Sequence, residues 1–338
     1  MKLLSKHLPA QMNEKAYLSK NIFSPKLEII ATRDGYGDAV TEAGKKNTDI
    51  VVLAADLTDS TRSNGFEEAF PDRFIEVGVA EQNMAGIAAG LALEGKTPFI
   101  ASYATFSPGR NWDQIRVSVC YSKTNVKIIG AHAGLSVGPD GATHQALEDI
   151  AITRVLPNMT VLCPADYEES KKATLAAIKH KGPVYIRLAR EKTAAFTTDK
   201  TPFEIGKALT LIEGKDVTIF SAGPILYEAL KASQELSLKH GISCEVINLA
   251  SIKPLDKKAI IESAKKTRKV VTVEEHQVHG GIGSAVAEVL SQEYPVPMKI
   301  IGVEDTFGES GTYEELWEKY GINDAHIVNE VRDFLGKH

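Results

Sequence analysis

The sequence predicts an α/β protein: a doubly wound, mostly parallel sheet domain followed by a smaller α/β C-terminal domain. Short apolar runs of strand length alternate with helical periodicity along almost the whole chain. The 338 residues exceed what one domain usually holds. Because strands that alternate with helices pair in parallel through crossover connections, these observations favour sheets with helices on both faces.

The elements of the first half follow from these apolar runs, with flanking glycine and proline separating strands from buried helices. The predicted strands are residues 50–55, 98–101, 126–131, 159–163 and 184–188. The predicted helices are residues 83–93, 112–121 and 168–178.

A polar stretch after residue 190 interrupts this rhythm, and a second α/β series follows it. Its predicted strands are residues 217–220, 243–248, 269–273 and 299–302, and its predicted helices are residues 224–238, 256–264 and 282–290. We therefore divide the chain into a lead-in at 1–25, a first domain at 26–192, a linker at 193–202 and a second domain at 203–338. The lead-in is expected to be extended, as a remnant linker or as an arm on a partner.

Composition excludes several functional classes. The net charge is −5, and 43% of the residues are hydrophobic, as in ordinary globular proteins. Nucleic acid is not expected as a partner because phosphate binding needs a surplus of lysine and arginine. No apolar run reaches the roughly 20 residues that span a bilayer, and no signal-peptide segment is found. The three cysteines form no CxxC pair, which together with the missing signal predicts a cytoplasmic protein.

Common nucleotide and hydrolase motifs are missing. Neither Gly35-Tyr36-Gly37 nor Gly281-Ile282-Gly283 completes a dinucleotide fingerprint, and no P-loop, GxSxG elbow or HExxH is found. His276 and His279 have no third ligand nearby and precede two glycines. This segment is therefore expected to be a loop leading into a helix, not a metal site.

Polar segments instead gather where strands of the first domain are expected to end, the edge at which open α/β sheets build their sites. They are 56–60, 78–83, 103–106, 131–145 and 187–190. Taken singly, their residues allow ordinary roles. Glu81 could complement a helix dipole, the histidines could bond to backbone, and Phe106 could belong to the core.

Taken together, these segments resemble the C-terminal half of transketolase. The resemblance rests on GVAEQNMAGIAAGLA, SYATF, AHAGLSVGPDGATHQALED, VTVEEHQVHGGIGSAVAEVL and DTFGESGTYEELWEKYGI, and runs from about Arg33 to the C-terminus. The family binds thiamine diphosphate between two α/β domains. By this resemblance, the chain would consist of the pyrimidine-binding and C-terminal domains, whereas the diphosphate-binding GDG…N motif is absent from it. The chain thus resembles one subunit of a split transketolase.

The resemblance implies a role for each matching residue. Glu81 would hydrogen-bond the N1′ nitrogen of the aminopyrimidine, Phe106 would stack on that ring, and Tyr103 and Asp56 would shape the pocket. His144 would contact oxygens near the reacting carbon and help move protons, and Asp140 would contact a donor hydroxyl. The substrate phosphates would be held by Arg33, Ser60, His132 and Arg190.

The resemblance also implies partners and a reaction. The chain would transfer a two-carbon ketol unit from a ketose phosphate, such as xylulose 5-phosphate, to an aldose phosphate, such as ribose 5-phosphate, in the pentose phosphate pathway. An N-terminal subunit with the GDG…N motif would hold the diphosphate and Mg²⁺ (or Ca²⁺), in an α2β2 heterotetramer; no metal ligand is expected on this chain. The alternatives are an E1 β subunit of a 2-oxoacid dehydrogenase, a deoxyxylulose-phosphate synthase-like enzyme, or a non-catalytic scaffolding subunit.

Overall fold

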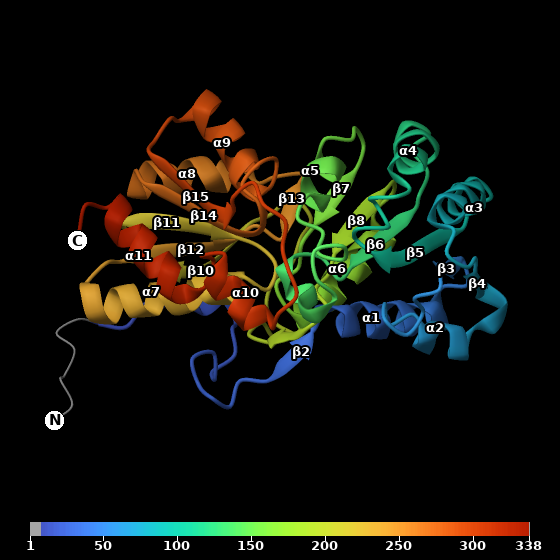
Figure 1. Cartoon of the computed structure of the whole chain (residues 1–338), viewed down its shortest axis with the longest axis horizontal. Helices are drawn as coiled ribbons and strands as arrows, with labels where there is room; N and C mark the ends of the chain where they lie inside the picture. The colour runs from blue at the N-terminus through green and yellow to red at the C-terminus, as the bar shows by residue number, and fades with distance from the viewer. Residues whose placement is uncertain (1–7, 338) are drawn as a thin grey trace.

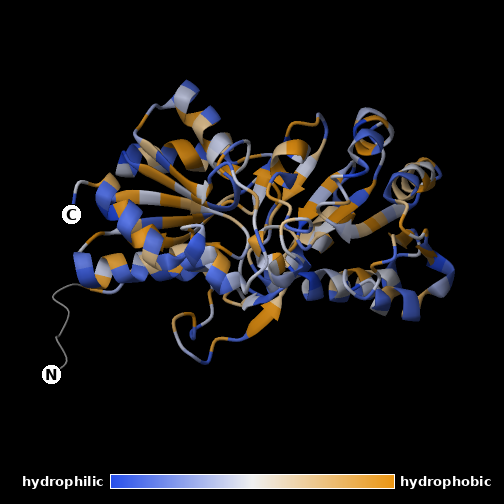
Figure 2. Ribbon diagram, viewed as in Figure 1, coloured by the Kyte–Doolittle hydropathy of each residue, from blue (hydrophilic) through white to orange (hydrophobic). Residues whose placement is uncertain are grey.

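The computed structural model describes residues 8–337, which form two α/β halves lying side by side (Figure 1). Each half has its own sheet, and Figure 2 shows hydrophobic strands enclosed by helices with hydrophilic outer faces. Among residues 8–337, no helix is both long and apolar enough to cross a membrane.

The first sheet has seven strands in the order β13-β7-β8-β6-β5-β3-β4, all parallel except β13. Its parallel strands are β3 (Ile50–Ala54), β4 (Phe74–Glu76), β5 (Thr97–Tyr103), β6 (Lys127–Ala131), β7 (Thr160–Leu162) and β8 (Val184–Arg187). Side chains alternate across the sheet, so Phe99 joins one core cluster and Ile100 the other. Both faces are therefore covered, as the long apolar strands predict.

Helices cover the two faces of this sheet in separate groups. On one face lie α1 (Thr32–Lys46), α2 (Asn64–Ala69) and α6 (Tyr167–Lys179), and on the other α3 (Glu81–Leu93), α4 (Trp112–Gln114) and the π-helical η3 (Ile115–Tyr121). The predicted helix 112–121 thus consists of α4 and η3. Two shorter helices, η4 (Leu135–Asp140) and α5 (Asp149–Arg154), follow β6.

The second sheet has six strands in the order β1-β10-β12-β11-β14-β15. They are β1 (Gln11–Met12), β10 (Leu209–Glu213), β11 (Val217–Ser221), β12 (Cys244–Asn248), β14 (Val270–Gln277) and β15 (Met298–Val303). The last four are parallel, and β10 and β1 extend the edge antiparallel. Its helices are α7 (Leu226–His240), α8 (Lys257–Thr267), α9 (Ile282–Glu293), α10 (Tyr313–Lys319) and α11 (Asp324–Phe334).

The two halves share strands and core. Strand β13 (Ser251–Lys253) leaves the second half and pairs with β7 of the first sheet. One hydrophobic cluster runs from Met84 of α3 through Phe220 of β11 to Ile282 of α9. The two halves are therefore packed as one body.

The predicted lead-in and linker are both packed in the structure. In the lead-in, β1 pairs with β10, and the Ile22 carbonyl accepts a hydrogen bond from the Tyr227 hydroxyl at 2.7 Å. The linker region opens with β9 (Lys192–Ala194), which pairs with β2 (Ile29–Ala31), and the buried Asp166 accepts from the N–H groups of Phe196 and Thr197. Residues 8–25 thus lie on their own chain, and residues 1–7 of the predicted lead-in lie outside the described part.

All predicted strands and helices of both series are confirmed within a few residues. The sequence did not predict several elements, among them the helices α1, α2, α10 and α11. Helix α1 was missed because its first turns contain two glycines. A Cβ at Gly35 would lie 2.3 Å from the Tyr167 carbonyl oxygen, and one at Gly37 would lie 2.5 Å from the Arg62 carbonyl oxygen. These glycines allow α1 to approach its neighbours closely, which is a tertiary requirement that helical propensity does not reveal.

Candidate active site

Glu81 is the first residue of α3 and lies at the carboxyl-end edge of the first sheet. Its side chain is 1% exposed, yet its only ion-pair partner in the described part, Arg110, is 47% exposed. Arg110 Nη1 donates to Glu81 Oε1 at 2.8 Å and to Oε2 at 2.9 Å. The guanidinium carbon of Arg110 also lies over the Phe106 ring, 4.5 Å from its centroid. The carboxylate of Glu81 is therefore buried, and the partly exposed guanidinium of Arg110 separates it from solvent.

Four aromatic side chains, which we call the ring cluster, lie at or after the ends of β5 and β6: Tyr103, Phe106, His132 and His144. Tyr103 stacks on His132 with centroids 3.8 Å apart, and on Phe106 at 5.8 Å. His144 meets Tyr103 and Phe106 edge-on, at 5.9 and 5.4 Å. Phe106 thus links the ring cluster to the Glu81–Arg110 pair.

Three arginines, Arg33, Arg62 and Arg190, lie near enough to His132 for their charges to lower its pKa; we call them the arginine group. Arg33 Nη1 donates to the Ser60 carbonyl at 2.7 Å and lies 3.4 Å from His132 Nε2. Burial, together with the charges of Arg33 and Arg190, lowers the pKa of His132 to about 2. His132 is therefore neutral at any physiological pH.

The neutral imidazole of His132 carries one N–H donor, and this donor has no partner within residues 8–337. Because a guanidinium can only donate, Nε2 of His132 is the acceptor toward Arg33, and the ring proton lies on Nδ1. Neither His132 Nδ1 nor Arg33 Nε has a hydrogen-bond partner within residues 8–337, although both are buried. Since buried donors are nearly always paired in folded proteins, these two point to a ligand with acceptor oxygens.

The other two arginines have partial partners. Arg62 Nε is paired with Asp34 at 2.6 Å, and Arg190 Nη1 donates to the Val137 carbonyl and to Glu191. The excess of positive charge around His132 is typical of a site for a phosphate or a similar anion.

Two predicted site residues lie apart from the ring cluster. Asp56 is exposed in the left-handed region (φ 58°), and its N–H donates to Glu76 Oε1 at 2.8 Å. Asp140 is exposed at the end of η4, and within residues 8–337 its side chain has no hydrogen bond or ion pair. Ser60 reaches Arg33 through its carbonyl, not its hydroxyl. The contacts described above join Tyr103, Phe106, His132, His144 and Arg33 directly and Glu81 through Arg110. Arg190 acts on His132 through its charge.

Sequence reasoning missed Arg110 and Arg62. Arg110 follows Phe106 by four residues, which was a usable signal because a cation just after a strand end lies near the same sheet edge. Arg62 carried a similar signal, because it lies two residues after the segment 56–60 that follows the end of β3. Its proximity to Arg33 could not be predicted, since it depends on the close packing of α1.

The His276 segment differs from its prediction as a loop. His276 and Gln277 are the last two residues of β14, and the loop before α9 begins only at Val278. His276 is buried, and its Nδ1 lies 2.7 Å from the Gln277 carbonyl oxygen. No group of three or more potential metal ligands occurs within residues 8–337.

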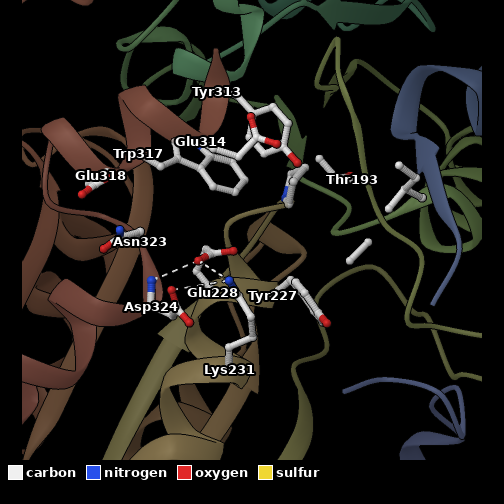
Figure 3. Close-up of a pocket in the computed structure, with 13 residues that line it drawn as sticks. Thr193, Tyr227, Glu228, Lys231, Tyr313, Glu314, Trp317, Glu318, Asn323 and Asp324 are labelled. Atoms are coloured by element: carbon white, nitrogen blue, oxygen red, sulfur yellow. Dashed lines mark hydrogen bonds and ion pairs between the residues drawn. The ribbon is translucent and has the colours of Figure 1, made fainter. Parts of the chain in front are cut away.

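A separate cavity of about 320 Å³ lies between β9, α7, α10 and α11 (Figure 3). Its charged groups compensate one another, since Lys231 Nζ lies 2.9 Å from Glu228 Oε2 and 3.5 Å from Asp324 Oδ1. The Asp324 N–H also donates to Glu228 at 3.0 Å. None of the predicted site residues lines this cavity, so the sheet edge remains the candidate site.

Comparison with known families covers most of the chain. Residues 28–194 match the family "Transketolase, pyrimidine binding domain", and residues 206–327 match "Transketolase, C-terminal domain".

Individual relatives agree with these matches. The chain is 45% identical over 309 residues to a putative transketolase C-terminal section of Methanocaldococcus jannaschii, covering 90% of this chain and 96% of that protein. It is 43% identical to a 6-deoxy-6-sulfo-D-fructose transketolase subunit of Clostridium sp. (strain MSTE9), covering 92% and 96%. A solved structure described as "Split gene transketolase, inactive beta4 tetramer" superposes with a TM-score of 0.85 at 48% identity, covering 91% of this chain and 99% of that one.

Proposed function

The chain belongs to the transketolase family, as a C-terminal subunit of the split type, and we propose that with an N-terminal partner it transfers a two-carbon ketol unit between sugar phosphates. The donor would be a ketose phosphate such as xylulose 5-phosphate, and the acceptor an aldose phosphate such as ribose 5-phosphate, as in the pentose phosphate pathway. The observation that carries the proposal is the buried Glu81 carboxylate beside Phe106, with the arginine group at the other end of the ring cluster.

Membership of the family implies dependence on thiamine diphosphate, and the residues present fit its aminopyrimidine ring. A buried carboxylate that can accept a hydrogen bond from a ring nitrogen and the aromatic face of Phe106 both contact the same planar group, the guanidinium of Arg110. Glu81 and Phe106 would hold the ring, with Tyr103 behind Phe106. When bound, the cofactor supplies the nucleophilic carbon and the electron sink for cleaving and forming the carbon–carbon bond.

The chain's own residues would then divide the work. Glu81 would hold a proton at the ring nitrogen, which a carboxylate can share and an amide cannot. His144, half-buried at the edge of Tyr103 and Phe106, would contact oxygens near the reacting carbon and move protons. Arg33 and Arg190 would bind the substrate phosphate, and the Nδ1–H of His132 would donate to a substrate oxygen.

The remaining assignments complete the proposed site. Ser60 would assist phosphate binding, Asp140 would contact a donor hydroxyl, and Asp56 would shape the pocket wall. Neither aspartate contacts the ring cluster directly in this chain, so both roles require that substrate or partner extend the site toward them.

The missing diphosphate motif supports a two-chain enzyme. We propose a partner of the N-terminal type that carries GDG…N and the metal ion, Mg²⁺ or Ca²⁺, in a cytoplasmic α2β2 assembly. Two relatives are named for other sugars. One is the 6-deoxy-6-sulfo-D-fructose transketolase subunit already described. The other is an apulose-4-phosphate transketolase subunit of Phocaeicola vulgatus, which is 38% identical over 310 residues. Because sulfonate and phosphate are both tetrahedral anions, the arginine group would also fit a sulfonated donor, which makes it a second candidate substrate.

Reconstitution tests the proposal. The chain is mixed with a GDG…N partner, thiamine diphosphate, Mg²⁺, xylulose 5-phosphate and ribose 5-phosphate, and sedoheptulose 7-phosphate is measured. We expect product from the pair and none from either chain alone. The 6-deoxy-6-sulfo-D-fructose donor is run in parallel to compare kcat/KM. Activity of the single chain, or an assembled pair that turns over neither donor, would refute the proposal.

A further inference from the structure

The guanidinium of Arg110 occupies the two contacts that the proposed cofactor ring needs. It donates to both carboxylate oxygens of Glu81, at 2.8 and 2.9 Å, and lies over the Phe106 face at 4.5 Å. A guanidinium is planar, cationic and carries N–H donors. It therefore satisfies a buried carboxylate and an aromatic face in the way that a protonated heteroaromatic ring would.

This ion pair is asymmetric. Glu81 is 1% exposed and Arg110 is 47% exposed, so the carboxylate is fixed in the protein while the cation is partly in water. A buried carboxylate without a partner is strongly disfavoured, which explains why the unpartnered chain holds a cation there. Of the two partners, Arg110 is the one that can leave the ion pair, because water can solvate the guanidinium once it moves out of the site.

The backbone around Arg110 stays anchored independently of its side chain. The Arg110 N–H donates to the Phe106 carbonyl at 2.9 Å, and its carbonyl accepts from Gln82 Nε2 at 3.4 Å. The next residue, Asn111, is buried and donates to the Glu81 carbonyl at 3.2 Å. The side chain can therefore swing away without moving α3 or the segment after β5.

We propose that Arg110 is a built-in stand-in for the aminopyrimidine ring: it fills the Glu81–Phe106 site in the unpartnered chain and is displaced when the cofactor binds. Only one planar group at a time can lie on this face of Phe106 and donate to Glu81. The affinity for the cofactor is thus set by how much more strongly the aminopyrimidine ring binds Glu81 and Phe106 than the guanidinium of Arg110 does. The inference rests on the proposed function, because it takes the displacing group to be thiamine diphosphate.

The first test uses the full-length single chain and a small probe, 2-methylpyrimidin-4-amine, which is the heterocycle of the cofactor. In Arg110→Ala the site is vacated, and calorimetric titration should detect probe binding roughly tenfold tighter than to the unaltered chain, as expected for one charge-assisted hydrogen bond at a half-exposed position. Methylguanidinium at millimolar concentration should compete with the probe in the variant. Arg116→Ala, which removes another exposed arginine from the following helix, is the matched control and should bind the probe like the unaltered chain.

The second test uses the reconstituted pair. Arg110→Ala should lower the Kd for thiamine diphosphate, measured by calorimetry, by roughly three- to thirtyfold. If Arg110→Ala does not fold by near-UV circular dichroism, Arg110→Gln replaces it, and its probe affinity should also exceed that of the unaltered chain. Equal or weaker probe binding in Arg110→Ala than in the unaltered chain, or a higher Kd for thiamine diphosphate, would refute the proposal that Arg110 occupies the site of the aminopyrimidine ring. A pair with unaltered Arg110 that binds no thiamine diphosphate would instead overturn the proposed function, while the probe titration would still decide on Arg110.

Discussion

Two arginine–carboxylate regions lie on the same side of the first sheet, and they are built in opposite ways. In the candidate site, Glu81 is buried and Arg110 is 47% exposed. At the domain junction, which we define as Asp149, Tyr185, Arg187 and Glu275, the ion-paired side chains of Asp149 and Arg187 are 1% and 5% exposed. The first pair can exchange its cation for a ligand, and the second cannot.

The junction satisfies almost every donor of its arginine. Arg187 Nε donates to Asp149 Oδ2 at 2.9 Å, and Nη2 donates to the Glu275 carbonyl at 2.8 Å. Asp149 also accepts from the Tyr185 hydroxyl at 2.7 Å, and the Glu275 side chain accepts from Trp317 Nε1 at 3.1 Å. These contacts join β8 and α5 of the first half to β14 and α10 of the second.

The difference in pairing distinguishes charged groups that stabilise the fold from charged groups that are available to a ligand. At the junction each charge is enclosed by protein partners, so the region fixes one arrangement of the two halves. In the candidate site, by contrast, His132 Nδ1 and Arg33 Nε are buried without partners. A protein tolerates such groups where a ligand completes them. Substitutions in the two regions should therefore affect different properties.

The largest effect is expected for Glu81→Gln in the reconstituted pair. Removing a residue that holds a proton in the reaction should lower kcat for ketol transfer by about 10²–10⁴-fold. Glu94→Gln, at the exposed C-terminal end of the same helix, should retain full activity. The free energy of unfolding of the Glu81→Gln chain should change by less than about 2 kcal/mol, because the exposed Arg110 remains solvated. Near-normal transfer would remove Glu81 from the mechanism.

Asp149→Asn should show the reverse pattern. Asparagine removes the carboxylate that forms the buried ion pair with Arg187, and the free energy of unfolding should fall by about 3–5 kcal/mol in urea titrations. Activity per folded complex should change little, because the junction does not touch the ring cluster. The control is Glu288→Gln, which breaks the pair of Glu288 (59% exposed) with Arg154 and should cost about 0–1 kcal/mol. A loss in Asp149→Asn no larger than in the control would contradict the comparison.

More of the fold than of the candidate site could be predicted from the sequence. Continuous apolar strands such as β3 and alternating helices reveal the two-sheet architecture, because burial on both faces leaves a strong pattern. The strand β13 exchanged between sheets could not be predicted, since three residues carry no signal of which sheet they join. In the site, Glu81 and Phe106 stand out by motif, but the contact between Arg110 and Glu81 depends on how the segment after β5 folds back onto α3.

Arg190→Ala tests the arginine group, with a smaller expected effect. Loss of one charge-assisted contact should raise KM for phosphorylated sugars by about 10–100-fold. KM for unphosphorylated substrates such as glycolaldehyde should change far less, because they lack the anion. Lys192→Ala removes a nearby exposed cation and serves as the control. Equal losses on both substrate types would show that Arg190 acts on the fold of the η4 loop, through its contact with Val137, and not on phosphate.

His132→Asn gives the smallest and most specific effect, a change in how the stability of the single chain depends on pH. Burial and the arginine group lower the pKa of His132 from 6.5 to about 2. The unfolded chain therefore takes up a proton below pH 6.5 that the folded chain refuses. The stability from neutral His132 is present above pH 6.5 and is lost as the pH falls, by up to about 1.4 kcal/mol per pH unit.

Asparagine tolerates the left-handed conformation of residue 132 (φ 54°) but does not titrate. The variant should therefore lose stability less steeply than the unaltered chain between pH 6.5 and 4.5, in urea titrations at several pH values. His326→Asn, at an exposed histidine, should leave the steeper profile in place. Parallel profiles for His132→Asn and the unaltered chain would mean that His132 is protonated in the fold. The arginine group would then be repelled by a cation at its centre, and that would contradict an anion site built around a neutral imidazole.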